Sequence, residues 1–142
     1  MTTLAAPDVL DARGRRMVAP AATLGGLALV TVALHVRDPH VQGSWGVCPL
    51  AAMGVYCPGC GGLRAVNDLT HGDVAAAASS NLAFVVLLPF LVLGLALWVR
   101  ARWRGVPLRP DPRVVARVTW AGFAVLLVFA VLRNLPGSWL AP

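Results

Sequence analysis

The sequence contains no lysine and no glutamate, and charged residues of any kind make up only 13% of its 142 residues. All of its positive charge comes from twelve arginines and all of its negative charge from six aspartates, which gives a formal net charge of +6. Hydrophobic residues make up 58% of the chain, well above the usual share in a soluble domain. This scarcity of charge excludes an ordinary soluble domain and indicates a protein built for a lipid environment.

The chain also lacks a glycine-rich GxGxxG loop, a P-loop, a zincin motif and a Ser/His/Asp signature, so no motif predicts a named reaction and a non-enzymatic role is favoured. Nine of the twelve arginines lie in two short segments, residues 13–16 and 100–117, which flank apolar runs. A nucleic-acid interface needs basic residues on a folded polar surface. The distribution therefore excludes nucleic acid as a partner and predicts contact with the lipid bilayer.

Three apolar runs are each long enough to cross a bilayer, which takes about 20 helical residues. They cover residues 17–36, 74–99 and 114–132. The first run is too long for the apolar region of a cleaved signal peptide, and no small-residue cleavage site follows it. Pro89 is expected to kink the second run. We therefore predict that residues 1–142 form one all-α membrane domain with three transmembrane helices.

The arginine distribution predicts the orientation of this domain. Residues 1–16 carry three arginines, and the connector of residues 100–113 together with the next helical turn carries six. The loop of residues 37–73 carries two, and the tail of residues 133–142 carries one. By the positive-inside rule, the first two segments are cytoplasmic and the last two lie outside. We expect a multi-pass protein of the bacterial cytoplasmic (inner) membrane.

The outer loop contains all the cysteines of the chain, Cys48, Cys57 and Cys60, and prolines follow the first two as Pro49 and Pro58. Three uses of this C-x8-C-x2-C pattern remain open. The thiolates can hold a metal ion such as zinc. Alternatively, Cys57 and Cys60 form a CxxC redox pair before a helix N-terminus, which favours thiolate. The third use is one structural disulfide. The sequence lacks a CxxCH motif, which disfavours haem.

Apolar residues at helical spacing predict a short amphipathic helix over residues 62–71 that lies along the bilayer surface, with Asn67 and Asp68 turned away from its apolar face. Such a helix puts His71 roughly 15 Å from Cys60, too far to share an ion with it. His40, on the loop before the cysteines, is the other candidate for a fourth metal ligand, and an open fourth position is the third possibility.

The run from Cys48 to Asn81 resembles the small bacterial membrane proteins of the domain of unknown function 2752 family. The matching positions are Cys48, Pro49, Cys57, Pro58, Cys60, Gly61, Arg64, Ala65, His71, Gly72, Asp73 and Asn81. The chain departs from the family at Leu63, where threonine is usual, and at Leu82, where proline is usual. The resemblance implies the membrane fold and this set of site residues, and it implies no reaction.

These observations together predict a non-enzymatic accessory or assembly protein whose three cysteines hold a metal ion or a structural knot. The rival prediction is a membrane thiol–disulfide oxidoreductase or electron-transfer component that uses Cys57 and Cys60. A larger membrane protein complex is compatible with either role, although no residue identifies its other members or the oligomeric state.

Overall fold

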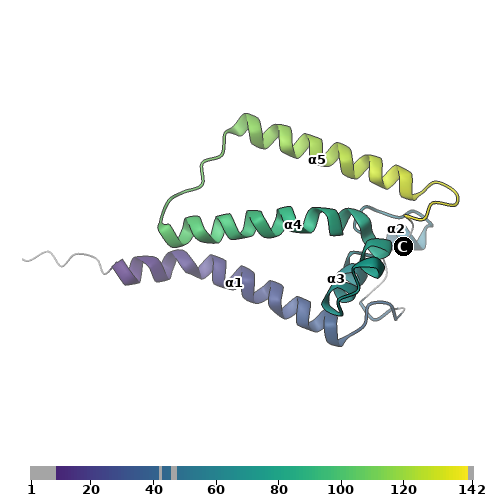
Figure 1. Ribbon diagram of the computed structural model, residues 1–142, viewed down its shortest axis with the longest axis horizontal. Helices are drawn as coiled ribbons and strands as arrows, with labels where there is room; N and C mark the ends of the chain where they lie inside the picture. Colours follow the sequence, from purple (N-terminus) through teal and green to yellow (C-terminus); the bar gives the residue numbers. More distant parts are fainter. Residues whose placement is uncertain (1–8, 42, 46–47, 141–142) are drawn as a thin grey trace, which may run out of the picture.

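The protein is helical in the computed structural model, which describes residues 9–41, 43–45 and 48–140 (Figure 1). The beginning of the predicted cytoplasmic tail, residues 1–8, and the end of the predicted outer tail, residues 141–142, lie outside the described residues. The helices are α1 (Val9–Val36), α2 (Pro49–Ala52), α3 (Gly62–Thr70), α4 (Val74–Arg104) and α5 (Pro112–Arg133).

Three of these helices are long and apolar enough to cross a membrane, over Arg13–Val36, Val74–Arg104 and Pro112–Arg133. Their apolar side chains are largely exposed, as Leu29, Phe90 and Trp120 illustrate. Exposing an apolar side chain to lipid has no free-energy cost, and each helix makes the hydrogen bonds of its own backbone N–H and C=O groups. The described residues contain no strand. The predicted fold class is confirmed, including the short helix α3 after the cysteine-containing loop.

Local sequence explains where the helices begin and end. Pro112 starts α5, and the Asp111 carboxylate caps it by accepting a hydrogen bond from a backbone N–H of the first turn. The Asp73 carboxylate accepts a hydrogen bond from the Ala76 N–H at 2.8 Å and caps α4 in the same way. Gly72 links α3 to α4 with φ of 82°, a value that glycine adopts without strain.

The α4 helix is broken near its start. The backbone leaves helical angles at Asn81, where φ is −160° and ψ is 93°, and not at Pro89, where the sequence predicted a kink. The Asn81 side chain accepts a hydrogen bond from the Phe84 N–H at 2.9 Å, which is the geometry of an N-cap. Asn81 therefore begins a second helical section that contains most of the apolar span.

The short helix α3 crosses the ends of α1 and α4 and packs against both (Figure 1). Its buried side chains are Ala65, Asn67 and Asp68, whereas Leu63 is 45% exposed. Asn67 and Asp68, which were predicted to lie away from the apolar face of α3, are buried against α1 and α4. Lipid accepts the apolar face of α3, so the protein interior is where its amide and carboxylate find hydrogen-bond partners.

The start of α1, the end of α4 and the connector from α4 to α5 lie at the end of the bundle opposite α3 (Figure 1), and residues 13–16 and 100–117 carry nine of the twelve arginines. Near the start of α1, the guanidinium of Arg13 lies 4.9 Å from the centre of the Trp103 ring near the end of α4. Arg16 approaches Gly105, which terminates α4. The α5 helix packs little against the other long helices, and its C-terminal end meets the cysteine loop.

Replacing Asn81 with alanine should destabilise the fold by about 2–4 kcal/mol, because it removes an N-cap and the two hydrogen bonds that the Asn81 amide donates to the carbonyls of Pro58 and Cys60. The measurement is denaturation by SDS in mixed micelles, followed by circular dichroism. The control is Ser79→Ala, since Ser79 is exposed and bonds only to a carbonyl in its own helix. Equal stability of the two variants would contradict the role assigned to Asn81.

Candidate functional site

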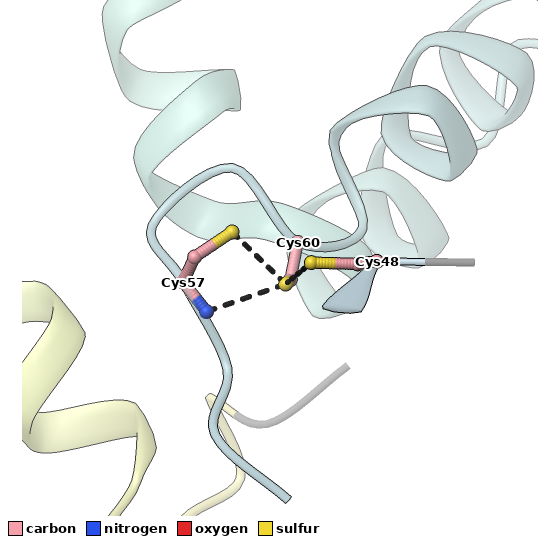
Figure 2. A group of neighbouring side chains, drawn as sticks. All are labelled: Cys48, Cys57 and Cys60. Carbon is pink, nitrogen blue, oxygen red and sulfur yellow. Dashed lines mark hydrogen bonds between the residues drawn. The ribbon is translucent and has the colours of Figure 1, made fainter. Parts of the chain in front are cut away.

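The three cysteines lie together at the end of the bundle that carries α3 (Figures 1 and 2). Cys48 immediately precedes α2, and Cys57 and Cys60 lie on the loop between α2 and α3. The Cys57 and Cys60 sulfurs are 3.0 Å apart, and the Cys60 and Cys48 sulfurs are 3.7 Å apart. All three sulfurs lie within 4.8 Å of one another. The structure thus brings together residues separated by up to twelve positions in the sequence.

These distances suit a shared ion. A disulfide requires sulfurs about 2.05 Å apart, and all three cysteines are free. A tetrahedral zinc ion with zinc–sulfur bonds near 2.3 Å holds its sulfurs about 3.8 Å apart. The Cys48–Cys60 distance of 3.7 Å matches this spacing, while the Cys57–Cys60 pair is closer. Small rotations of the side chains would therefore place three thiolates around one ion.

The loop between Cys57 and Cys60 is a tight turn. The Cys60 N–H donates to the Cys57 carbonyl at 3.0 Å, and the Cys57 N–H approaches the Cys60 sulfur at 3.3 Å (Figure 2). Pro58 fits this turn because its φ is fixed and it needs no hydrogen-bond acceptor. Gly61 follows with φ of 80° as the N-cap of α3. Together, these residues direct two sulfurs to one side of the turn.

Side chains from α4 and α5 fix the carbonyl groups of the turn. Asn81 donates to the carbonyls of Pro58 at 2.8 Å and Cys60 at 3.1 Å. Arg133 donates through Nη1 to the carbonyls of Cys57 at 2.9 Å and Pro58 at 3.4 Å. The thiol turn is therefore held by the long helices as well as by its own backbone.

The residue that caps the end of α5, Asn134, adds a further attachment. Asn134 accepts a hydrogen bond from the Tyr56 N–H and donates one to the Tyr56 carbonyl, both at 2.8 Å. Sequence reasoning assigned Arg133 and Asn134 to the outer tail and missed them as site residues. The available signal was an isolated arginine at the outer end of an apolar span, where the positive-inside rule disfavours one.

The thiols differ in their surroundings. Burial, followed by hydrogen bonding with Cys57, raises the pKa of Cys60 to about 12. A hydrogen bond from the backbone at Ala51, followed by one from Cys60, lowers the pKa of Cys48. Cys48 is consequently the thiol that ionises more readily, and Cys60 is the one that benefits most from a nearby positive charge.

The thiols open onto a pocket of about 740 Å³. Cys48, Cys57 and Cys60 all line it, as do His40 and Arg64. A small molecule or a side chain of another protein has room to reach the sulfurs there.

The structure places neither proposed histidine ligand among the three thiols. The ring of His40 faces two carboxylates, with Nδ1 2.8 Å from Asp38 and Nε2 3.3 Å from Asp68. A hydrogen bond from the His40 backbone N–H, followed by the one from the His40 ring, lowers the pKa of Asp38. His71 caps the end of α3, where its Nδ1 donates to the Asn67 carbonyl at 2.9 Å. Within the described residues, the group able to share an ion contains only the three cysteines.

Both histidines belong to a second polar cluster, which joins α1, α3 and α4. The ring of His35, near the end of α1, stacks on that of His71 with 4.3 Å between ring centres. The Asn67 amide donates to the Leu34 carbonyl at 2.7 Å, and the Ser80 hydroxyl donates to Asp68 at 2.8 Å. A pocket of about 360 Å³ lies at this cluster. It is lined by His35, Asp38, His40, Asn67, Asp68, His71 and Asp73.

Sequence reasoning missed His35, Asp38, Asp68 and Ser80 as members of this cluster. Their only sequence signal is position, because each lies at or beside the outer end of an apolar helix or on the short helix. The family resemblance pointed to His71, Gly72 and Asp73 without indicating what they contact. The structure shows that this part of the motif lies where α3 turns into α4.

In metal-free protein, Cys48 should react with iodoacetamide before Cys60, because thiolate is the reactive form and Cys48 holds more of it. The Cys48 rate should level off below pH 9.0, the value of an unperturbed thiol, while the Cys60 rate keeps rising toward about pH 12. Mass spectrometry of peptides after timed labelling measures both rates. Protein unfolded in denaturant is the control and should lose the difference. Faster labelling of Cys60 than of Cys48 in folded protein would contradict the assigned burial.

Comparison with known proteins finds one family that resembles the segment carrying this site. Residues 48–95 match the family described as "Protein of unknown function (DUF2752)", a match that runs from Cys48 into the second apolar span. No curated protein and no solved structure matches the chain. The match confirms the predicted resemblance to the DUF2752 family over residues 48–95, the middle part of the chain.

Proposed function

We propose that this protein is a non-enzymatic accessory or assembly protein of the bacterial cytoplasmic membrane that holds a divalent metal ion, such as zinc, on Cys48, Cys57 and Cys60. The observation that carries the proposal is the convergence of three free thiols to within 4.8 Å of one another. Thiolates are preferred ligands of zinc. The side chains that fix the turn hold two of these ligands in place, as metal sites generally require.

The proposed orientation puts the cysteine loop on the outer side of the membrane. Its support is that the start of α1 and the end of α4, which carry Arg13, Arg16 and Arg104, lie at the opposite end of the bundle (Figure 1). Cytoplasmic segments are enriched in arginine. The loop would then face a compartment in which free thiols are prone to oxidation, and a bound ion would protect them.

The fourth coordination position is proposed to be filled from the pocket. Zinc sites with three protein ligands keep a position open for water or an incoming group. The pocket of about 740 Å³ lies at the three sulfurs, and His40 and Arg64 also line it. A ligand donated by another member of a membrane complex would fit an assembly role.

The rival function is thiol–disulfide exchange or electron transfer by Cys57 and Cys60. Their sulfurs form the closest pair, 3.0 Å apart, and a modest movement would allow a disulfide. In that case Cys48 is dispensable for the chemistry. A purely structural disulfide loop is the remaining alternative, and it would give a bond that persists until the protein is reduced.

Detergent-purified protein prepared under reducing conditions should bind about one zinc or cobalt ion per chain. Cys48→Ala should lose the ion because it removes one of three ligands. Elemental analysis gives the stoichiometry, and cobalt absorption reports thiolate coordination. The matched control is Tyr56→Phe, which keeps the backbone bonds to Asn134 and should bind the ion normally.

A thiol-labelling mass shift separates the rivals in the same preparation. The metal proposal fails if no ion binds and Cys57 and Cys60 instead show a reversible two-electron mass change that survives Cys48→Ala. A stable two-sulfur bond with no change on cycling between mild oxidant and reductant would favour the structural disulfide.

A further inference from the structure

The guanidinium of Arg133 lies beside the thiol turn without a countercharge. The residue is only 1% exposed, and it ends the third apolar span. Nη1 donates to the carbonyls of Cys57 and Pro58, but Nε and Nη2 are buried and have no hydrogen-bond partner among the described residues. The guanidinium also lies 5.0 Å from the centre of the Phe129 ring, which faces the cation but carries no net charge.

No carboxylate in the described part of the chain forms an ion pair with Arg133, since the pairs found there join His40 to Asp38 and Asp68. A buried charge without a partner is costly, and an arginine cannot become neutral to escape this cost. The thiols are groups near Arg133 that can become negative, because Arg133 is bonded to the backbone of Cys57 itself.

A metal-bound cysteine centre has the charge that Arg133 lacks. A divalent ion with three thiolates carries a net charge of −1, which one buried arginine balances. Three neutral thiols or a disulfide would leave the guanidinium uncompensated. Arg64 also lines the pocket, but it is only partly buried and water screens it.

We propose that Arg133 is the buried counter-cation of the cysteine centre and selects the anionic form of that centre, in which one divalent ion binds three thiolates. This inference rests on the proposed function. On binding, three S–H bonds break, three metal–sulfur bonds form and three protons leave, with no change in oxidation state. Arg133 is a positioning residue that acts on the ligands without touching the metal.

The charge of the complex provides the test. Arsenite binds the same three thiols, since As(OH)₃ and three S–H groups give As(S–Cys)₃ and three water molecules. This complex is neutral, so a counter-cation does not stabilise it. If Arg133 only shapes the loop, its replacement should weaken cobalt and arsenite binding equally. If Arg133 acts through its charge, its replacement should weaken cobalt binding alone.

The experiment titrates full-length protein in detergent with Co²⁺, with Zn²⁺ in competition, and separately with arsenite. Arg133→Gln should weaken Co²⁺ and Zn²⁺ binding about 10- to 100-fold, the usual effect of removing an outer partner of a metal site, and should leave arsenite affinity unchanged. Arg133→Lys keeps the charge and should bind Co²⁺ more tightly than Arg133→Gln. The matched control is Arg117→Gln, an exposed arginine on the same helix, which should behave as wild type.

The outcomes separate the two proposals. Unchanged Co²⁺ affinity in Arg133→Gln would overturn the role of Arg133 and leave the metal site intact. An equal loss of Co²⁺ and arsenite affinity would also overturn it, since the residue would then act through structure. Absence of Co²⁺ and Zn²⁺ binding in wild-type protein would overturn the proposed function and this inference together. Arg133→Met is judged by the same criteria if Arg133→Gln does not accumulate.

Discussion

Backbone carbonyl groups at the edge of a bilayer must find hydrogen-bond donors within the protein, and the thiol turn of this protein depends on that constraint. A turn between Cys57 and Cys60 uses few of its own carbonyls, so donors come from distant helices. Asn81 reaches the turn from the break in α4, and Arg133 reaches it from the end of α5. The same bonds fix the sulfurs and attach α5, which packs little against the other long helices. The hydrogen bonds that set the geometry of the thiol turn therefore also set the position of α5.

The same constraint explains why α3 turns its polar face inward. A surface helix of a soluble protein buries apolar residues and exposes charged ones. Here Leu63 is exposed, while Asn67 and Asp68 are buried and bonded to α1, to α4 and to the loop that carries His40. Because lipid accepts apolar groups and rejects polar ones, the inversion is what a helix at the membrane boundary requires.

The chemistry of the site follows from charge as much as from geometry. Three thiols converge at a pocket, and a buried guanidinium bonded to the same turn has no carboxylate partner among the described residues. A divalent ion on three thiolates would use the three sulfurs as ligands, and its net negative charge would balance the guanidinium. The segment that matches the DUF2752 family, residues 48–95, contains all three cysteines and Asn81 but not Arg133. The arginine is supplied by a helix outside the matched region.

The sequence by itself determined the helical membrane fold, because apolar runs about 20 residues long have few alternatives to spanning a bilayer. It also determined the cysteine motif and the Asp73 cap, since both are local patterns. Only the tertiary structure decided which side chains meet that motif. Arg133 lies 76 positions from Cys57, and Asn81 lies 23 from Pro58, so no local spacing connects them. Periodicity gave the correct extent of α3 to within a residue but not the partners of its polar face, because a helical pattern alone does not say which elements that face meets.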